Sequence, residues 1–169
     1  MGKFPWYFPY FLHSCRYNPT VDFLILTDNN DPSFELPTNV KIIPYSLGQF
    51  KTDAAKALGF DVAVESYYKL CDFKPAYGTV FADYIKEYDF WGYCDVDVIF
   101  GNIRAFMTDE LLAADFGDTR PVISVIPVHY CYRRPSKQSD KVTFFFLNFH
   151  LLIQSDAKHA QSGQEWHQQ

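Results

Sequence analysis

One stretch, VDFLILTDNN at residues 21–30, restricts the fold more than any other part of this 169-residue chain. Its apolar side chains form a near-continuous run, without the strict alternation of a half-exposed strand, and the run stops at Asp28. A strand of this kind is buried on both faces, as in parallel sheets that helices cover. The stretch therefore predicts an α/β protein.

The segments around this strand alternate between helix and strand patterns. The other expected elements are helices at 6–18, 46–58 and 108–116, and strands at 39–46, 88–101 and 120–128. Residues 62–88 are expected to form helical segments broken at Lys74–Pro75, because the residue before a proline avoids the helical region. This order predicts an α/β domain with a mainly parallel sheet flanked by helices.

Composition argues against several functional classes. The formal net charge of −5 disfavours a nucleic-acid partner, whose phosphates are bound by clustered Lys and Arg. The apolar N-terminal stretch is too short for a spanning helix, so no transmembrane segment is expected. Four widely spaced cysteines give no thiolate metal site and are typical of a reducing compartment. We therefore expect a cytoplasmic protein, with peripheral attachment at the inner membrane face as an option.

Two aspartates, Asp95 and Asp97, lie one residue apart inside the apolar run WGYCDVDVIF. In an extended backbone they would share one face, with Val96 on the other. Two carboxylates placed in this way suit Mg²⁺ or Mn²⁺, which take hard oxygen ligands. The alternative is a turn after a strand, in which both carboxylates are hydrated. The bulky apolar flanks favour a metal site.

The segment KLCDFKPAYG (residues 69–78) precedes DFWGYCDVDVIFGN (residues 89–102). In this order the two segments resemble bacterial glycosyltransferases of the capsular-polysaccharide type, which have a GT-A (Rossmann-like) fold and an Asp-x-Asp motif. The upstream stretch GKFPWYFPYFLHSCRYNPTVDFLILTDN and the segment NVKIIPYSLGQF are also similar to that family. The resemblance covers roughly residues 2–125.

The resemblance implies a metal-dependent transfer of a hexosyl group from a nucleotide-sugar, expected to be a UDP-sugar, to a saccharide or lipid-linked saccharide acceptor of surface-polysaccharide synthesis. Asp95 and Asp97 would hold the divalent cation, Mn²⁺ or Mg²⁺. The expected donor-binding residues are Thr27, Asp28, Asp72, Lys74 and Asp95. Without the resemblance, Asp72 reads as a surface carboxylate and Lys74 as a solvated lysine. Thr27 and Asp28 suit either a ligand site at a strand's carboxyl end or a plain turn. No catalytic residue is assigned.

The chain departs from that family at both ends. The family's first strand, which lies in the middle of the sheet, would precede Met1, and its loss would expose apolar edges of neighbouring strands. We expect an incomplete nucleotide-sugar-binding domain at 1–128 and an irregular tail at 129–169, which is either disordered or frame-shifted.

A non-catalytic remnant or nucleotide-binding module is the alternative function. A phosphatase-like hydrolase ranks last, because its Asp-x-Asp would follow the first strand.

Overall fold

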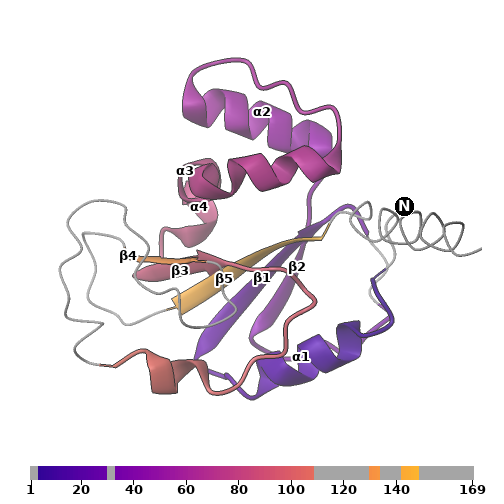
Figure 1. Ribbon diagram of the computed structural model, residues 1–169, viewed down its shortest axis with the longest axis vertical. Coiled ribbons are helices and arrows are strands. Elements are labelled where there is room, and N and C mark those ends of the chain that lie inside the picture. Colours follow the sequence, from indigo (N-terminus) through magenta and orange to yellow (C-terminus); the bar gives the residue numbers. More distant parts are fainter. Residues whose placement is uncertain (1–3, 30–32, 109–129, 134–141, 149–169) are drawn as a thin grey trace, which may run out of the picture.

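The computed structural model describes residues 4–29, 33–108, 130–133 and 142–148, which form a mixed α/β fold with a five-stranded sheet between two layers of helices (Figure 1). The elements are α1 (Phe8–Arg16), β1 (Val21–Thr27), β2 (Val40–Pro44), α2 (Leu47–Leu58), the 3-10 helix η1 (Tyr67–Ala76), α3 (Tyr77–Val80), α4 (Ala82–Ile85), β3 (Phe90–Tyr93), the 3-10 helix η2 (Ile103–Phe106), β4 (Tyr130–Arg133) and β5 (Val142–Asn148). The predicted helix at 108–116 (from 109 onward) and strand at 120–128 fall outside the described residues.

Strand β1 is buried on both faces, as its apolar run predicts. Phe23 and Ile25 pack in a core with α1 and the segment that follows β3. Leu24 and Leu26 face the opposite way, into a second core that α2, η1, α3 and α4 cover. Figure 1 shows these layers, with α1 on one side of the sheet and α2 on the other. The prediction of an apolar strand between helical layers is confirmed.

The sheet has the order β2-β1-β5-β3-β4 and is mainly parallel, as expected. Strand β1 pairs in parallel with β2 and β5, and β3 pairs in parallel with β5. Only the β3–β4 pair is antiparallel among the described strands.

Strand β5 lies at the centre of the sheet, where the sequence predicted a missing strand. The sequence predicted exposed apolar edges where a first strand is lacking, and an irregular tail after residue 128. Instead, β5 lies between β1 and β3 and pairs with both, so these edges are covered. The tail therefore supplies two regular strands, β4 and β5; its other residues lie outside the described part of the chain.

Helix α2 has the ends that its sequence predicts. The Ser46 hydroxyl accepts a hydrogen bond from the Gln49 backbone N–H at 3.1 Å, which caps the N-terminus. Gly59 ends the helix with φ of 77°, a left-handed conformation that glycine adopts without strain.

The helical region after Ser66 departs from the prediction of a break at Lys74–Pro75. Helix η1 runs through Pro75, and α3 begins two residues later at Tyr77. Pro75 lies in the last turn of η1, so the change from the 3-10 helix to α3 comes just after the predicted position. A second boundary, between α3 and α4, falls at Phe81.

Gly78 lets α3 approach the sheet closely. A Cβ atom at this position would overlap the indole ring of Trp91, which is 7% exposed. We therefore expect Gly78→Ala to lower the free energy of unfolding by about 1–3 kcal/mol, the usual range for overpacking a core. Urea denaturation measures this loss. The matched variant Gly101→Ala, whose Cβ would meet no atom within 4 Å, should differ little from wild type. Equal losses in the two variants would contradict the packing argument.

Candidate functional site

The candidate site lies where β1 and β3 end. Both strands run parallel to β5, so their carboxyl ends point to the same edge of the sheet. Asp28 directly follows β1, and Asp95 comes two residues after the end of β3. Open parallel sheets bind ligands at this edge. The two aspartates are 67 residues apart in the chain, and the sheet brings their strand ends together.

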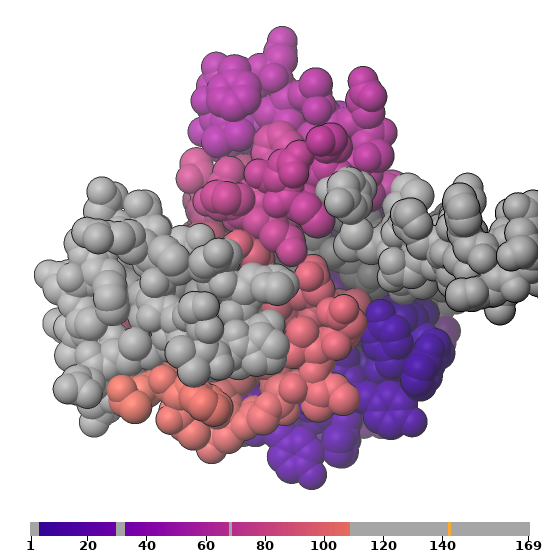
Figure 2. All heavy atoms as spheres, in the orientation of Figure 1, coloured from indigo at the N-terminus to yellow at the C-terminus, as the bar shows by residue number. Residues whose placement is uncertain are grey.

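Helix η1 contacts both strand ends. The Tyr67 hydroxyl donates a hydrogen bond to Asp28 Oδ2 at 3.1 Å. Seven residues along η1, Lys74 Nζ lies 3.4 Å from Asp95 Oδ2 and 3.5 Å from Asp95 Oδ1. Figure 2 shows the magenta side chains of this helical layer above the salmon residues that follow β3. The helix thus forms one wall of the site.

The Lys74–Asp95 pair is only partly shielded from solvent. The side chain of Lys74 is 21% exposed and that of Asp95 is 40% exposed. The Lys74 ammonium also lies 5.6 Å from the centre of the Tyr93 ring, within the range of a cation–π contact. An exposed carboxylate next to a fixed cation leaves both groups accessible to a ligand.

Only one of the two carboxylate oxygens of Asp28 has a hydrogen-bond partner among the described residues. Its Oδ2 accepts the Tyr67 hydroxyl, whereas its Oδ1 is buried and has no hydrogen-bond partner among the described residues. A buried acceptor without a partner costs about 1–3 kcal/mol. Burial raises the pKa of Tyr67, and its hydrogen bond to Asp28 and that residue's charge raise it further, so Tyr67 stays a donor.

The Asp-x-Asp segment is a turn, and the expected alternation along a strand is wrong. Pairing of β3 with β5 ends at Tyr93, so the extended backbone is no longer held there. Val96 and Asp97 form the turn and line the same pocket, so they do not lie on opposite faces. Asp95 faces η1, whereas Asp97 is exposed on the side of α1.

Cys94 lies beneath the charged groups of this turn. Burial raises the pKa of its thiol well above the usual value, and the negative charges of Asp95 and Asp97 add to the rise, while Lys74 lowers it. The thiol is therefore neutral and fills the core under the turn.

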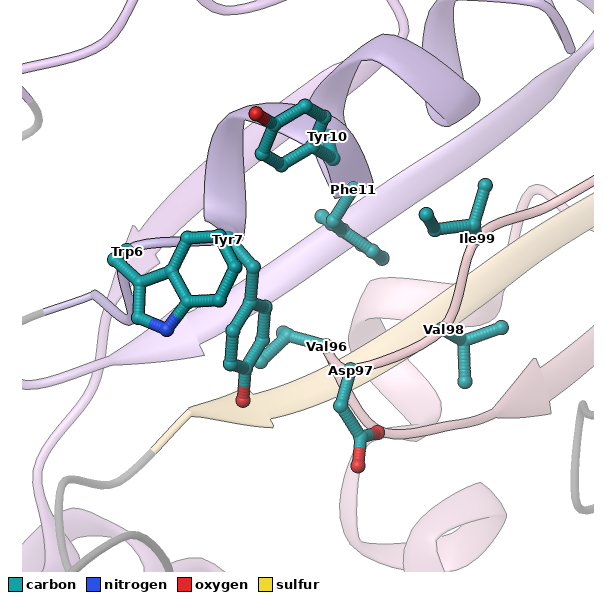
Figure 3. Close-up of a pocket in the computed structure, with 8 residues that line it drawn as sticks. All are labelled: Trp6, Tyr7, Tyr10, Phe11, Val96, Asp97, Val98 and Ile99. Carbon is teal, nitrogen blue, oxygen red and sulfur yellow. The ribbon is translucent and has the colours of Figure 1, made fainter.

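A pocket of about 270 Å³ opens beside Asp97, between the start of α1 and the segment after β3 (Figure 3). Trp6, Tyr7 and Tyr10 form its aromatic side, and Val96 and Val98 lie opposite. In Figure 3 the Tyr7 hydroxyl and the Asp97 carboxylate point to the same side. Burial raises the pKa of Tyr7, and the charge of Asp97 raises it further.

Two predicted donor-binding residues lie apart from these contacts. Thr27 is fully buried, and its hydroxyl accepts a hydrogen bond from the Asn29 N–H at 3.1 Å, so it shapes the end of β1 from inside. Asp72 is exposed and forms an ion pair with Lys69 at 3.2 Å. The role of both residues in donor binding stays a prediction.

Sequence reasoning missed Tyr67 and Asn18. Tyr67 begins the segment YYKLCDFKPAYG but was given no role, because only the fold brings its hydroxyl to Asp28. Asn18 is buried; its Nδ2 donates to the Gly101 carbonyl at 2.9 Å, and its Oδ1 accepts the Ile103 N–H at 2.8 Å. These bonds tie the segment after the Asp-x-Asp turn to the end of α1. In the sequence, Asn18 looks like an ordinary turn residue before Pro19.

The donor chemistry of the turn fits a hard divalent cation. Within the described ranges, no group of three or more His, Cys, Asp or Glu side chains is arranged to hold a metal. Mg²⁺ and Mn²⁺ sites of nucleotide-binding proteins commonly use one or two carboxylates together with substrate phosphates and water. Asp95 and Asp97 each present a carboxylate at this turn, and their binding of a cation stays a prediction. None of the helices in the described part of the chain has the length and apolar character needed to cross a bilayer.

One family model, described as "Family of unknown function (DUF6625)", matches residues 1–116 and so covers more than half of the chain. No curated protein and no solved structure gives a significant match. The matched range includes Asp28, η1 and the Asp-x-Asp turn.

Proposed function

The chain belongs to the DUF6625 family of unknown function, and we propose that it binds a nucleotide-sugar through a divalent cation and acts as a glycosyltransferase. The observation that carries this proposal is the position of η1, which contacts Asp28 through Tyr67 and Asp95 through Lys74. Along this one helix, at the ligand-binding edge of a parallel sheet, Asp28 is available as a hydrogen-bond acceptor for a nucleoside, and the Lys74–Asp95 pair is available for a diphosphate.

The nucleoside would occupy the Asp28 end of this site. The unpartnered Oδ1 of Asp28 would accept a hydrogen bond from a base N–H or a ribose hydroxyl, while Tyr67 holds the other oxygen in place. Uracil offers such an N–H, which agrees with the UDP-sugar that the sequence resemblance implies. A GT-A-like arrangement of this domain is part of the proposal, because that fold also places its donor at the carboxyl ends of parallel strands.

The diphosphate would lie at the other end of η1. Asp95 and Asp97 would hold Mn²⁺ or Mg²⁺, which offsets the negative charge of the diphosphate when bound. Lys74 would meet a phosphate oxygen as a point charge, since its ammonium already lies at the rim with 21% of the side chain exposed. The acceptor would be a saccharide or a lipid-linked saccharide of surface-polysaccharide synthesis, reached in the cytoplasm at the inner membrane face.

Isothermal titration calorimetry of the full chain with UDP tests the donor site. In Mn²⁺ we expect UDP to bind about tenfold or more tightly than in EDTA, because the cation bridges the carboxylates and the diphosphate. GDP and ADP serve as controls for the base, and uridine serves as a control for the diphosphate. If no nucleotide binds in Mn²⁺ or Mg²⁺, or if UDP binds equally well in EDTA, the proposed site is wrong.

A second measurement separates the enzyme from a non-catalytic binding module. Release of UDP from UDP-glucose, UDP-galactose or UDP-N-acetylglucosamine in Mn²⁺, with water as a slow acceptor, is expected of a glycosyltransferase. Tight UDP binding with no release from any of these donors would favour the binding module.

A further inference from the structure

The pocket beside Asp97 has features that the donor site does not use. Its aromatic side is unusually open: the side chain of Trp6 is 82% exposed and that of Tyr10 is 59% exposed. The Trp6 ring makes edge contacts with Tyr7 and Tyr10, at interplanar angles of 82° and 83°. The planes of the two tyrosine rings are therefore nearly perpendicular to the indole, which remains largely exposed.

This exposure distinguishes the residues from the core aromatics of the same segment. Phe8 and Phe11 are 0% and 1% exposed and stack on each other in the core below. From the sequence, the aromatic stretch at residues 4–11 suits either core packing or an acceptor platform, with core packing favoured, and Phe8 and Phe11 do pack in the core. Trp6 and Tyr10 point away from that core, and their exposed rings have a large apolar area available for a ligand.

The polar groups of the pocket indicate what kind of ligand fits. Asp97 and the Tyr7 hydroxyl lie at its rim, and none of the described residues that line it carries a positive charge. An anionic ligand is therefore disfavoured, while a neutral polyol would donate hydroxyl hydrogens to the Asp97 carboxylate. The volume of about 270 Å³ lies just below the about 300–1,000 Å³ of typical small-molecule pockets, which suits one or two sugar rings.

We propose that Trp6, Tyr10 and Asp97 form a saccharide subsite, in which the apolar C–H face of a neutral sugar stacks on Trp6 and its hydroxyls bond to Asp97. The subsite rests on the proposed function in one respect: we assign the sugar as the acceptor. Asp95 contacts η1 on the donor side and Asp97 lines the pocket, so the pocket adjoins the proposed donor site at the Asp-x-Asp turn.

Saturation-transfer NMR on the full chain tests the subsite with four neutral probes: methyl β-glucoside, methyl β-galactoside, N-acetylglucosamine and rhamnose. At least one probe should receive saturation, strongest at the C–H protons of one ring face. Trp6→Ala should weaken its binding by about tenfold, since a stacked aromatic ring contributes on the order of 1 kcal/mol or more. Tyr10→Ala should also weaken binding of this probe.

Tyr17→Ala is the matched control, because Tyr17 is also an exposed aromatic residue of this region, at 72%, and does not line the pocket. It should bind the sugar as wild type does. The subsite is wrong if none of the four probes receives saturation, or if Trp6→Ala and Tyr17→Ala bind equally. The neutral alcohol 1-hexanol is included as an apolar probe; its binding at the Trp6 indole without binding of any sugar would also overturn the inference.

UDP titration of the same variants keeps the two proposals apart. Trp6→Ala should retain Mn²⁺-dependent UDP binding, because Trp6 is outside the contacts of Asp28 and Lys74. A wild-type chain that binds a sugar but no UDP would refute the donor site and leave the subsite standing. A chain that binds UDP but no sugar would refute the subsite and leave the donor site standing.

Discussion

Replacing Asn39 by aspartate should lower the free energy of unfolding at pH 7 by about 3–5 kcal/mol, as expected for an uncompensated buried charge. The Asn39 side chain is buried, and its Nδ2 donates to the carbonyl oxygens of Cys15, Asn18 and Val21 at 2.9–3.0 Å. Aspartate has nearly the same shape but no donor, so its carboxylate would face three carbonyl oxygens. Urea denaturation gives the loss.

The loss should depend on pH with a defined sign. Burial and the facing carbonyls disfavour the carboxylate, so the pKa of Asp at position 39 would be higher in the folded than in the unfolded chain, where it is about 3.9. Relative to wild type, the variant should therefore be least destabilised below about pH 4. The loss grows as the pH rises and levels off above the folded pKa.

Asn102→Asp is the matched control for the same change of chemistry. Asn102 caps η2 at an exposed position, where its Oδ1 accepts the Ala105 N–H at 3.2 Å. An aspartate oxygen can accept the same bond, so this variant should stay close to wild type. Similar losses in both variants, or a loss at position 39 that does not change with pH, would show that the three carbonyl bonds do not stabilise the fold as argued.

The strand–helix pattern was readable from the sequence because each signal is local. The unbroken apolar run of β1 indicates burial on both faces, and Ser46 and Gly59 mark the ends of α2 through capping chemistry that needs only a few neighbouring residues. The Asp-x-Asp pair stands out because carboxylates are rare between bulky apolar residues.

What the sequence did not predict depends on contacts between distant segments. Strand β5 is not marked by any local signal as the partner of both β1 and β3, since strand order follows from the assembly of the whole sheet. Asn18 and Asn39 look like turn residues, and only their burial reveals the bonds that join α1, β1 and the segment after β3. Tyr67 likewise meets Asp28 across 39 residues of chain.

The candidate site shows the same limit. The motif segments predict its residue types, but they do not predict that Asp95 and Asp97 point to different sides of the turn. The sequence treats Asp95 and Asp97 as equivalent carboxylates on one strand face. The turn at Val96–Asp97 instead turns Asp95 towards Lys74 and Asp97 towards α1. Substitutions at the two positions should therefore differ in their effect on stability, although both should affect the cation.

Asp95→Asn and Asp97→Asn should each weaken UDP binding in Mn²⁺ by about tenfold or more, down to the affinity measured in EDTA, because each removes one charged oxygen ligand from a site with two protein carboxylates. Binding in EDTA should change little. Titration calorimetry with UDP in Mn²⁺ and in EDTA measures both values. Asp61→Asn, an exposed aspartate in the loop after α2, is the matched control and should bind UDP as wild type does.

The thermal stability of the same variants checks that the loss is not one of folding. Asp95→Asn breaks the pair with Lys74, but both side chains are partly exposed, so the cost should be only about 0–1 kcal/mol. Asp97 is exposed, and its replacement should leave the melting temperature nearly unchanged. UDP binding that survives both substitutions in Mn²⁺ would show that the turn holds no cation, and the donor would then have to be bound by Asp28 and Lys74 alone.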